Sequence, residues 1–129
     1  MKLYYKFRMF WYNFRARCQR FKRGWAYRDV WNMNDWFRNT IRPMLIYLAN
    51  NHVGVPAEFE NDPDGWKKVL NKMATCLQFM DEDSLIASLG IHDYKGMTAE
   101  DYKNVKKLMI EYKNRFFELF SKYYFDLWD

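Results

Sequence analysis

Residues 98–125, TAEDYKNVKKLMIEYKNRFFELFSKYYF, hold the most regular apolar pattern in the chain and decide its fold class. Apolar side chains recur there at alternating steps of three and four residues, which places them on one face of an α-helix. Thr98 and Asp101 have the spacing of a capping box, in which two side chains satisfy backbone N–H groups at the start of a helix. We therefore predict a helix from Thr98 to about Phe125 at the centre of a bundle, although a coiled-coil seam has the same pattern. The seven positions of its apolar face are Tyr102, Val105, Met109, Tyr112, Phe116, Leu119 and Tyr123.

Another helix is predicted N-terminal to this one, starting after Asp62. Asp62 is a suitable N-cap, and Pro63 suits the first helical position because proline needs no amide partner there. Residues 81–97 separate the two helices and are ambiguous: three acidic residues begin them, two glycines interrupt them, and only Ser84–Leu89 favours a short helical turn. The apolar face of the helix that follows Asp62 comprises Trp66, Val69, Leu70, Met73, Cys76, Leu77 and Met80.

A helix nearer the N-terminus is predicted from Asn32 or Asn34 to about Asn50. Pro43 lies inside it, so we expect a kink near residues 39–43, where proline removes a donor and clashes with the preceding turn. Residues 50–64 read as a loop, and no segment has a persuasive strand pattern. The prediction is therefore one all-α domain, residues 1–129, folded as a compact bundle of about four main helices. The apolar stripe of the helix that ends at about Asn50 is Phe37, Ile41, Met44, Leu45 and Leu48.

The first helix, predicted over residues 3–22, is basic and aromatic and could form an arm. Gly24 follows it and suits a C-terminal cap. Basic residues flank its apolar stripe without interrupting it, and Tyr4 and Trp11 extend one edge of the stripe. The stripe itself is Leu3, Phe7, Phe10, Phe14, Cys18 and Phe21.

Charge is divided unevenly at residues 23–36, RGWAYRDVWNMNDW. Nine lysine and arginine side chains and no carboxylate precede Asp29, so this part carries +9, whereas the whole chain carries +5 and the remainder therefore −4. Three of the six tryptophans lie in the same stretch. We interpret it as a hinge between a basic arm and an acidic body.

No arrangement of residues is typical of an enzyme, a metal centre or a cofactor site, so we expect none of these. His52 and His92 lack a second ligand at helical spacing, and the acidic run Asp81–Asp83 is better explained as a solvated turn. Cys18 and Cys76 match no metal or redox spacing, and we expect two reduced, partly buried thiols. No signal peptide or membrane span is visible, which favours the cytoplasm of the producing cell.

Several motifs together resemble a family of small bacteriophage proteins of uncharacterised function. They are the RGWAYRDVWNMNDW element, IRPML around Pro43, the NNHVGVPAEF loop, GWKKVLNKM and the FFELFSKYYFDLWD ending, which together span most of residues 23–129. Members tend to have acidic residues after the Arg-Gly-aromatic element, where this chain has Ala26, Tyr27 and Arg28. The resemblance implies a phage or prophage origin, and hence the host cytoplasm, but it supplies no catalytic or binding residues.

The basic arm is the one positive functional signal. Arginine and lysine neutralise phosphates or carboxylates, and exposed aromatic rings stack on bases or fill pockets of a partner. The simplest alternative is that the stripe is core and the cations are its solvated rim. Two hypotheses follow: a non-enzymatic phage protein that blocks or redirects a host protein or ribonucleoprotein, for example as an anti-defence inhibitor of a nucleic-acid-guided nuclease, or an accessory protein of phage replication or packaging that binds nucleic acid directly. An anionic membrane surface ranks lowest, because the chain is long enough to bury the stripe itself. The candidate partner-binding residues are Arg8, Arg15, Arg17, Arg20, Lys22, Arg23 and Trp25.

Overall fold

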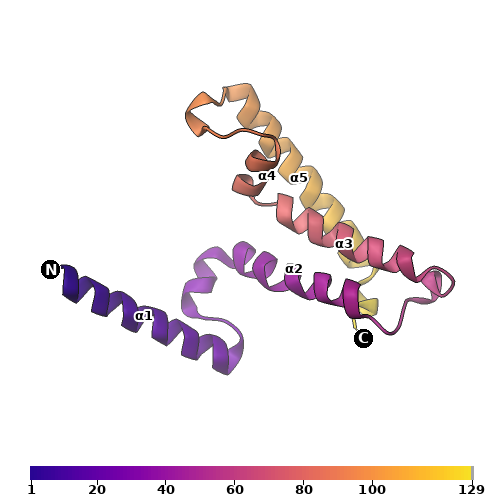
Figure 1. Cartoon of the computed structure of the whole chain (residues 1–129), viewed down its shortest axis with the longest axis horizontal. Coiled ribbons are helices and arrows are strands. Elements are labelled where there is room, and N and C mark those ends of the chain that lie inside the picture. Colours follow the sequence, from indigo (N-terminus) through magenta and orange to yellow (C-terminus); the bar gives the residue numbers. More distant parts are fainter. Residues whose placement is uncertain (129) are drawn as a thin grey trace. The chain divides into compact units, whose positions relative to one another are not determined.

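A computed structural model describes residues 1–128; Asp129, the last residue of the FDLWD ending, lies outside the described residues. Helices account for 81% of the chain, and residues 1–128 contain no strand, so the all-α prediction is confirmed. Four short 3-10 helices lie between or after the α-helices: η1 (Tyr27–Asn32), η2 (Ala57–Phe59), η3 (Tyr94–Gly96) and η4 (Tyr124–Asp126). The five α-helices (Figure 1) are α1 (Lys2–Arg23), α2 (Met33–Asn51), α3 (Pro63–Phe79), α4 (Glu82–Ser88) and α5 (Ala99–Lys122).

The chain divides into two compact units, Met1–Phe37 and the residues from Arg38 onward, and the boundary falls inside α2. The basic arm predicted at residues 3–22 corresponds to α1 and belongs to the first unit. That the two units form one domain stays a prediction.

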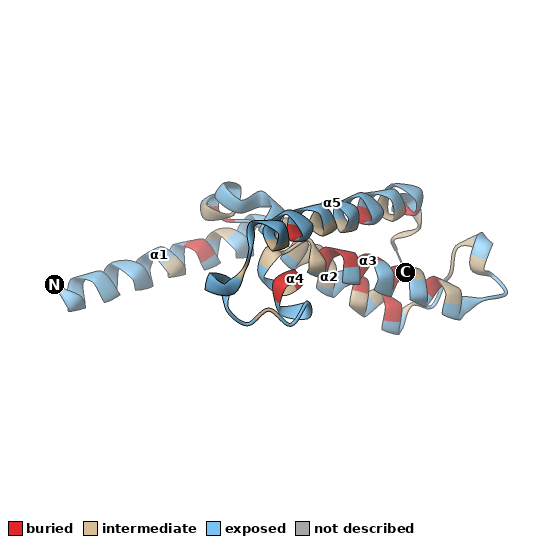
Figure 2. Cartoon of the chain, turned by 90° about the horizontal axis from the view of Figure 1, so that it is seen from above, coloured by how far each residue is buried: buried red, intermediate tan, exposed pale blue. Residues whose placement is uncertain are grey.

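The core of the second unit lies where α5 packs along α3 and α4 closes one end. Trp66 and Leu70 of α3 and Phe116 of α5 are 1% exposed or less. Figure 2 shows buried positions in red on both helices. Burying each such side chain contributes about 1.5–3 kcal/mol, so these contacts dominate the stability of the unit. The long C-terminal helix is therefore central to the packing, as predicted. Leu85, Ile86 and Val105 form a neighbouring cluster with Phe79, Ile91, Met97, Leu108, Met109 and Tyr112.

The loop before α3 closes the other end of this core with aromatic rings. Phe59 of η2 lies with its ring centroid 5.7 Å from that of Trp66 and 5.9 Å from that of Tyr123. Trp66 and Tyr123 meet edge to face at 5.3 Å. The Tyr123 hydroxyl donates to the Glu58 carboxylate at 3.3 Å, so a polar group at the edge of the core has a partner.

Three helix starts follow from local sequence. The Asp62 carboxylate accepts the Gly65 N–H at 3.0 Å, and Thr98 and Asp101 form the predicted capping box, with bonds of 3.1 Å and 2.9 Å. These two starts are confirmed. In the ambiguous region α4 begins at Glu82, two residues before the predicted turn, because the Asp81 carboxylate caps it.

Each carboxylate of the acidic run 81–83 has a partner within the fold. Burial alone would raise the pKa of Asp81, but hydrogen bonds from Ser84 and the nearby Arg38 guanidinium outweigh burial and lower it. The Glu82 carboxylate forms an ion pair with Lys106 at 2.9 Å. The Asp83 carboxylate accepts a hydrogen bond from the Tyr94 hydroxyl, which raises the pKa of Tyr94 to about 12. Within residues 1–128 no group of three or more histidine, cysteine or acidic side chains could hold a metal ion.

Polar contacts hold one face of the part of α2 that belongs to the second unit, from Arg38 onward. Arg38 forms an ion pair with Asp81 at 3.0 Å, and Arg42 donates to the Ala74 carbonyl at 3.2 Å. Leu45, on the same face, is 4% exposed. These contacts decide which face of α2 is buried in this unit.

The adjacent face of α2 carries most of the predicted stripe and is left partly open. Met44, predicted as part of an inward-facing stripe, is 61% exposed, so the prediction is wrong at this position, whereas Leu45 of the same stripe is buried as predicted. The arginine contacts turn the helix so that Leu45 and Ala49 face inward and Met44 faces outward. The helix continues through Pro43 to Asn51, and the expected kink stays a prediction.

Candidate binding surface on the N-terminal helix

A sharp turn after α1 brings residues 25–32 back along the helix. Gly24 has the left-handed φ of 81°, and its N–H bonds to the Arg20 carbonyl at 2.8 Å, so the predicted C-terminal cap is confirmed. Ala26 is extended and fully buried, and η1 follows it directly and runs into α2. The stretch interpreted as a hinge is therefore an ordered fold-back.

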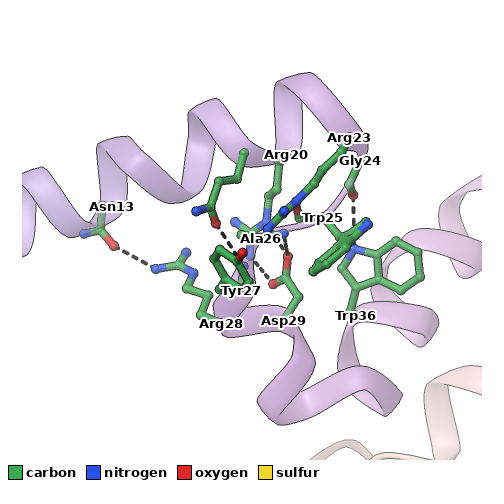
Figure 3. Close-up of polar contacts among 11 residues, drawn as sticks. Asn13, Arg20, Arg23, Gly24, Trp25, Ala26, Tyr27, Arg28, Asp29 and Trp36 are labelled. Carbon is green, nitrogen blue, oxygen red and sulfur yellow. Dashed lines mark hydrogen bonds and ion pairs between the residues drawn. The ribbon is translucent and has the colours of Figure 1, made fainter.

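Asp29 holds this fold-back in place. Its carboxylate accepts two hydrogen bonds from the Arg20 guanidinium, at 3.0 and 2.5 Å, and a third from the Ala26 N–H at 2.7 Å (Figure 3). The hydrogen bonds from Arg20 are the main cause that lowers the pKa of Asp29 to about 2, and the same pair raises the pKa of Arg20. Bidentate arginine–carboxylate pairs of this kind are among the stronger polar contacts in proteins.

Further contacts fasten the same side of α1. The Gln19 side chain accepts the Tyr27 N–H at 2.9 Å, and Arg28 donates to the Asn13 side chain at 2.8 Å. Ala16, between these positions on the helix, is 5% exposed. The fold-back thus covers the face of α1 that contains residues 13, 16, 19 and 20.

Arg23 and Trp25 also belong to the turn. The Arg23 guanidinium donates to the Trp25 carbonyl at 3.1 Å and lies 3.8 Å from the centroid of the Trp25 ring. Trp25 remains 37% exposed and lines a hollow of about 230 Å³ with Asp29, Val30, Met33 and Trp36. Of the seven predicted binding residues, Arg20, Arg23 and Trp25 are therefore engaged within the first unit.

The apolar stripe of α1 lies opposite the covered face. At 3.6 residues per turn, positions 3, 7, 10, 14, 18 and 21 point away from positions 13, 16, 19 and 20. Phe7, Phe10 and Phe21 are 70%, 63% and 93% exposed, and Cys18 is exposed rather than partly buried as predicted. The interpretation of Phe7, Phe10 and Phe14 as core is wrong for this structure, because the fold-back packs on the other side of the helix.

Basic side chains border the exposed stripe on both flanks. Arg8, Arg15 and Lys22 follow one row at seven-residue spacing, and Arg17 lies on the other flank with Lys6. Within the first unit, none of these five side chains has a hydrogen bond or an ion pair. The first unit carries nine cations and two carboxylates, a net charge of +7, whereas the second carries twelve cations and fourteen carboxylates, a net charge of −2.

Sequence reasoning found the row of cations but missed Asp29. Asp29 stands three residues after Ala26 and nine after Arg20, and the first of these spacings is the local signal that could have identified a cap.

The chain matches no protein-family model, no curated protein and no solved structure. None of the helices formed by residues 1–128 has the length and apolar character needed to cross a bilayer.

Proposed function

We propose that this is a non-enzymatic, phage-encoded binding protein that uses the cations of α1 to dock on an acidic surface of a host protein or ribonucleoprotein, which it blocks or redirects. The observation that carries the proposal is the set Arg8, Arg15, Arg17 and Lys22, which is exposed and has no ion pair within the first unit. Cations that the fold does not use remain available to a partner. Their one-signed field also steers an anionic partner to this side of the first unit.

The comparison between α1 and α4 supports a binding role for the arm. Around α4, Asp81, Glu82 and Asp83 each have a partner in the fold, which accounts for that charge cluster. On α1, the cations at positions 8, 15, 17 and 22 lack such partners within the first unit. Inhibition of a nucleic-acid-guided nuclease is one form that such binding would take. The phage origin and the host cytoplasm rest on the motif resemblance.

Direct binding of nucleic acid is the second candidate. It is favoured by exposed aromatic rings, such as Trp11 at 60%, beside the cationic rows, since rings stack on unpaired bases while cations neutralise phosphates. Salt distinguishes the two candidates. Nucleic-acid affinity falls steeply between low and physiological salt, whereas for a protein partner salt mainly slows association.

The test is a charge reversal with a matched control. We expect Arg8→Glu, Arg15→Glu and Lys22→Glu together to abolish capture of a partner from nuclease-treated host lysate. The control is Lys103→Glu, Lys107→Glu and Lys113→Glu on α5, which changes the net charge equally on exposed positions of the second unit.

The expected result is loss of specific bands with the α1 variant and their retention with both the control and the parent. Circular dichroism should show equal helix content in all three. Equal capture by the two variants would mean that the cations of α1 are only a solvated face. Direct binding of nucleic acid would be favoured by two results together. The captured bands would disappear when the lysate is treated with nuclease, and the parent, but not the α1 variant, would shift the mobility of random single-stranded DNA or RNA.

A further inference from the structure

The second unit contains an open apolar groove of about 780 Å³ between α2 and the end of the chain. Ile41, Met44 and Leu48 line it from the partly open face of α2, and Phe125 and Trp128 line it from the C-terminal tail. None of the lining residues is charged. Met44, Phe125 and Trp128 are 61%, 86% and 74% exposed, so the groove presents large apolar side chains to solvent.

Each unit, taken by itself, leaves a large apolar surface open: the stripe of α1 in the first unit and this groove in the second. An apolar groove of this kind is the surface that receives an amphipathic helix, whose anchors recur at three- and four-residue steps. The stripe of α1 supplies such anchors at Leu3, Phe7, Phe10 and Phe14. The two surfaces are therefore of complementary type.

Charge and shape favour a contact between a stripe and a groove over a contact between two stripes or between two grooves. Two α1 stripes facing each other would bring cationic rows alongside cationic rows, which like-charge repulsion opposes. Two grooves facing each other would leave a gap, because both are concave and a stable interface requires shape complementarity. A convex cationic helix in an uncharged groove avoids both problems, and it joins a unit of net charge +7 to one of −2. Asp126 lies between the lining residues Phe125 and Leu127 in the sequence and lines a separate hollow with Trp128.

The size of the stripe suits a stable contact. Each aromatic side chain of the stripe, and of its edge at Tyr4 and Trp11, has a surface of about 150–250 Å² that a partner could cover. All of these side chains are about half exposed or more. Together they offer on the order of 800 Å², which is what one partner contributes to a standard interface. The side chains counted are Tyr4, Phe7, Phe10, Trp11, Phe14 and Phe21.

We propose that two copies of the chain exchange their N-terminal helices, so that the apolar stripe of each α1 lies in the groove of the other copy. The exchange is reciprocal and satisfies both unpaired surfaces twice, as a closed two-fold dimer does. The cationic rows then lie at the edges of each contact, on either side of the buried stripe.

The experiment measures molar mass by light scattering over a dilution series, with two variants of the full chain. The stripe variant carries Phe7→Gln, Phe10→Gln and Phe14→Gln; the groove variant carries Tyr47→Gln, Phe125→Gln and Trp128→Gln. All six positions are exposed, so both variants should keep the parental circular dichroism spectrum. We expect the parent to be a dimer and each variant alone to be a monomer. An equimolar mixture should form a heterodimer, because one intact stripe then meets one intact groove.

Each other outcome overturns the exchange. A groove variant that still dimerises would indicate pairing of two α1 helices, and a stripe variant that still dimerises would indicate pairing of two grooves. A mixture that stays monomeric would rule out a stripe seated in the groove of another copy, and so would a parent that is monomeric at every concentration. Flotation of the monomer with anionic vesicles would assign the stripe to a lipid surface. Partner capture is a separate readout, so loss of the proposed function would leave the dimer result standing.

Discussion

The apolar stripes of α1 and α3 both follow the periodicity of one helical face in the sequence, but one is exposed in the structure and the other is buried. On α3 the apolar positions face α5 and are buried, as Leu70 and Met73 show at 0% exposure. On α1 they face away from the fold-back, and Phe7 is 70% exposed. Periodicity therefore predicts that a helix forms and which side chains share a face. It does not predict what covers that face.

The largest expected effect sharpens this comparison with one phenylalanine from each region. Phe116→Ala should lower the free energy of unfolding by about 3–5 kcal/mol, because Phe116 is 0% exposed and its truncation leaves a cavity. Phe10→Ala, at 63% exposure, should change it by less than about 0.5 kcal/mol. Urea denaturation at low protein concentration measures both. Equal losses would mean that the stripe of α1 is part of a core.

A smaller effect concerns the start of α3. A Cβ atom at Gly65 would lie 2.4 Å from the Asp62 carboxylate and 3.0 Å from the Phe59 ring. Gly65→Ala should therefore displace the cap and cost about 0.5–2 kcal/mol, the usual value for losing an N-cap. The control is Gly54→Ala, where nothing lies within 4 Å of the new atom. Calorimetry should show a lower melting temperature for the first variant only, and an unchanged value for Gly65→Ala would refute the assigned cap.

The smallest effect tests the fold-back of the first unit through pH. The pKa of Asp29 is lowered to about 2 from an ordinary value near 3.9. The contribution of its carboxylate to the stability of the first unit is therefore fully present above about pH 4 and is lost as the pH falls towards 2. A carbon-detected NMR titration should place the Asp29 midpoint near 2. Arg20→Gln should move the midpoint back towards 3.9, whereas Arg17→Gln should leave it in place. A parental midpoint near 3.9 would contradict the bidentate pair.

Much of the fold follows from local sequence because its signals lie within one turn. Asp62 with Pro63, Thr98 with Asp101 and Gly24 each satisfy backbone groups three or four residues away, which a sequence pattern can reveal. The stripe of α5 was also predictable, since one long helix with one apolar face has few ways to pack.

The candidate site was less predictable because it depends on contacts between separate segments. Arg20 could be recognised as a cation, but its pairing with Asp29 exists only once the chain reverses at Gly24. The fold-back also decides which face of α1 is covered, and nothing in the spacing of Phe7 and Phe10 indicates that choice. Likewise, Met44 faces outward because Arg42 bonds to the Ala74 carbonyl, 32 residues away.

The two cysteines allow the most direct test of the central claim, because one lies on each stripe. Cys18 is exposed on α1, whereas Cys76 is 2% exposed on α3, where burial raises its pKa. Thiol alkylation of the folded, dilute protein, read by mass spectrometry, should label Cys18 at the rate of a free thiol and leave Cys76 unmodified until denaturant is added. Protection of Cys18 equal to that of Cys76 in the monomer would contradict the claim that α1 presents an open apolar stripe.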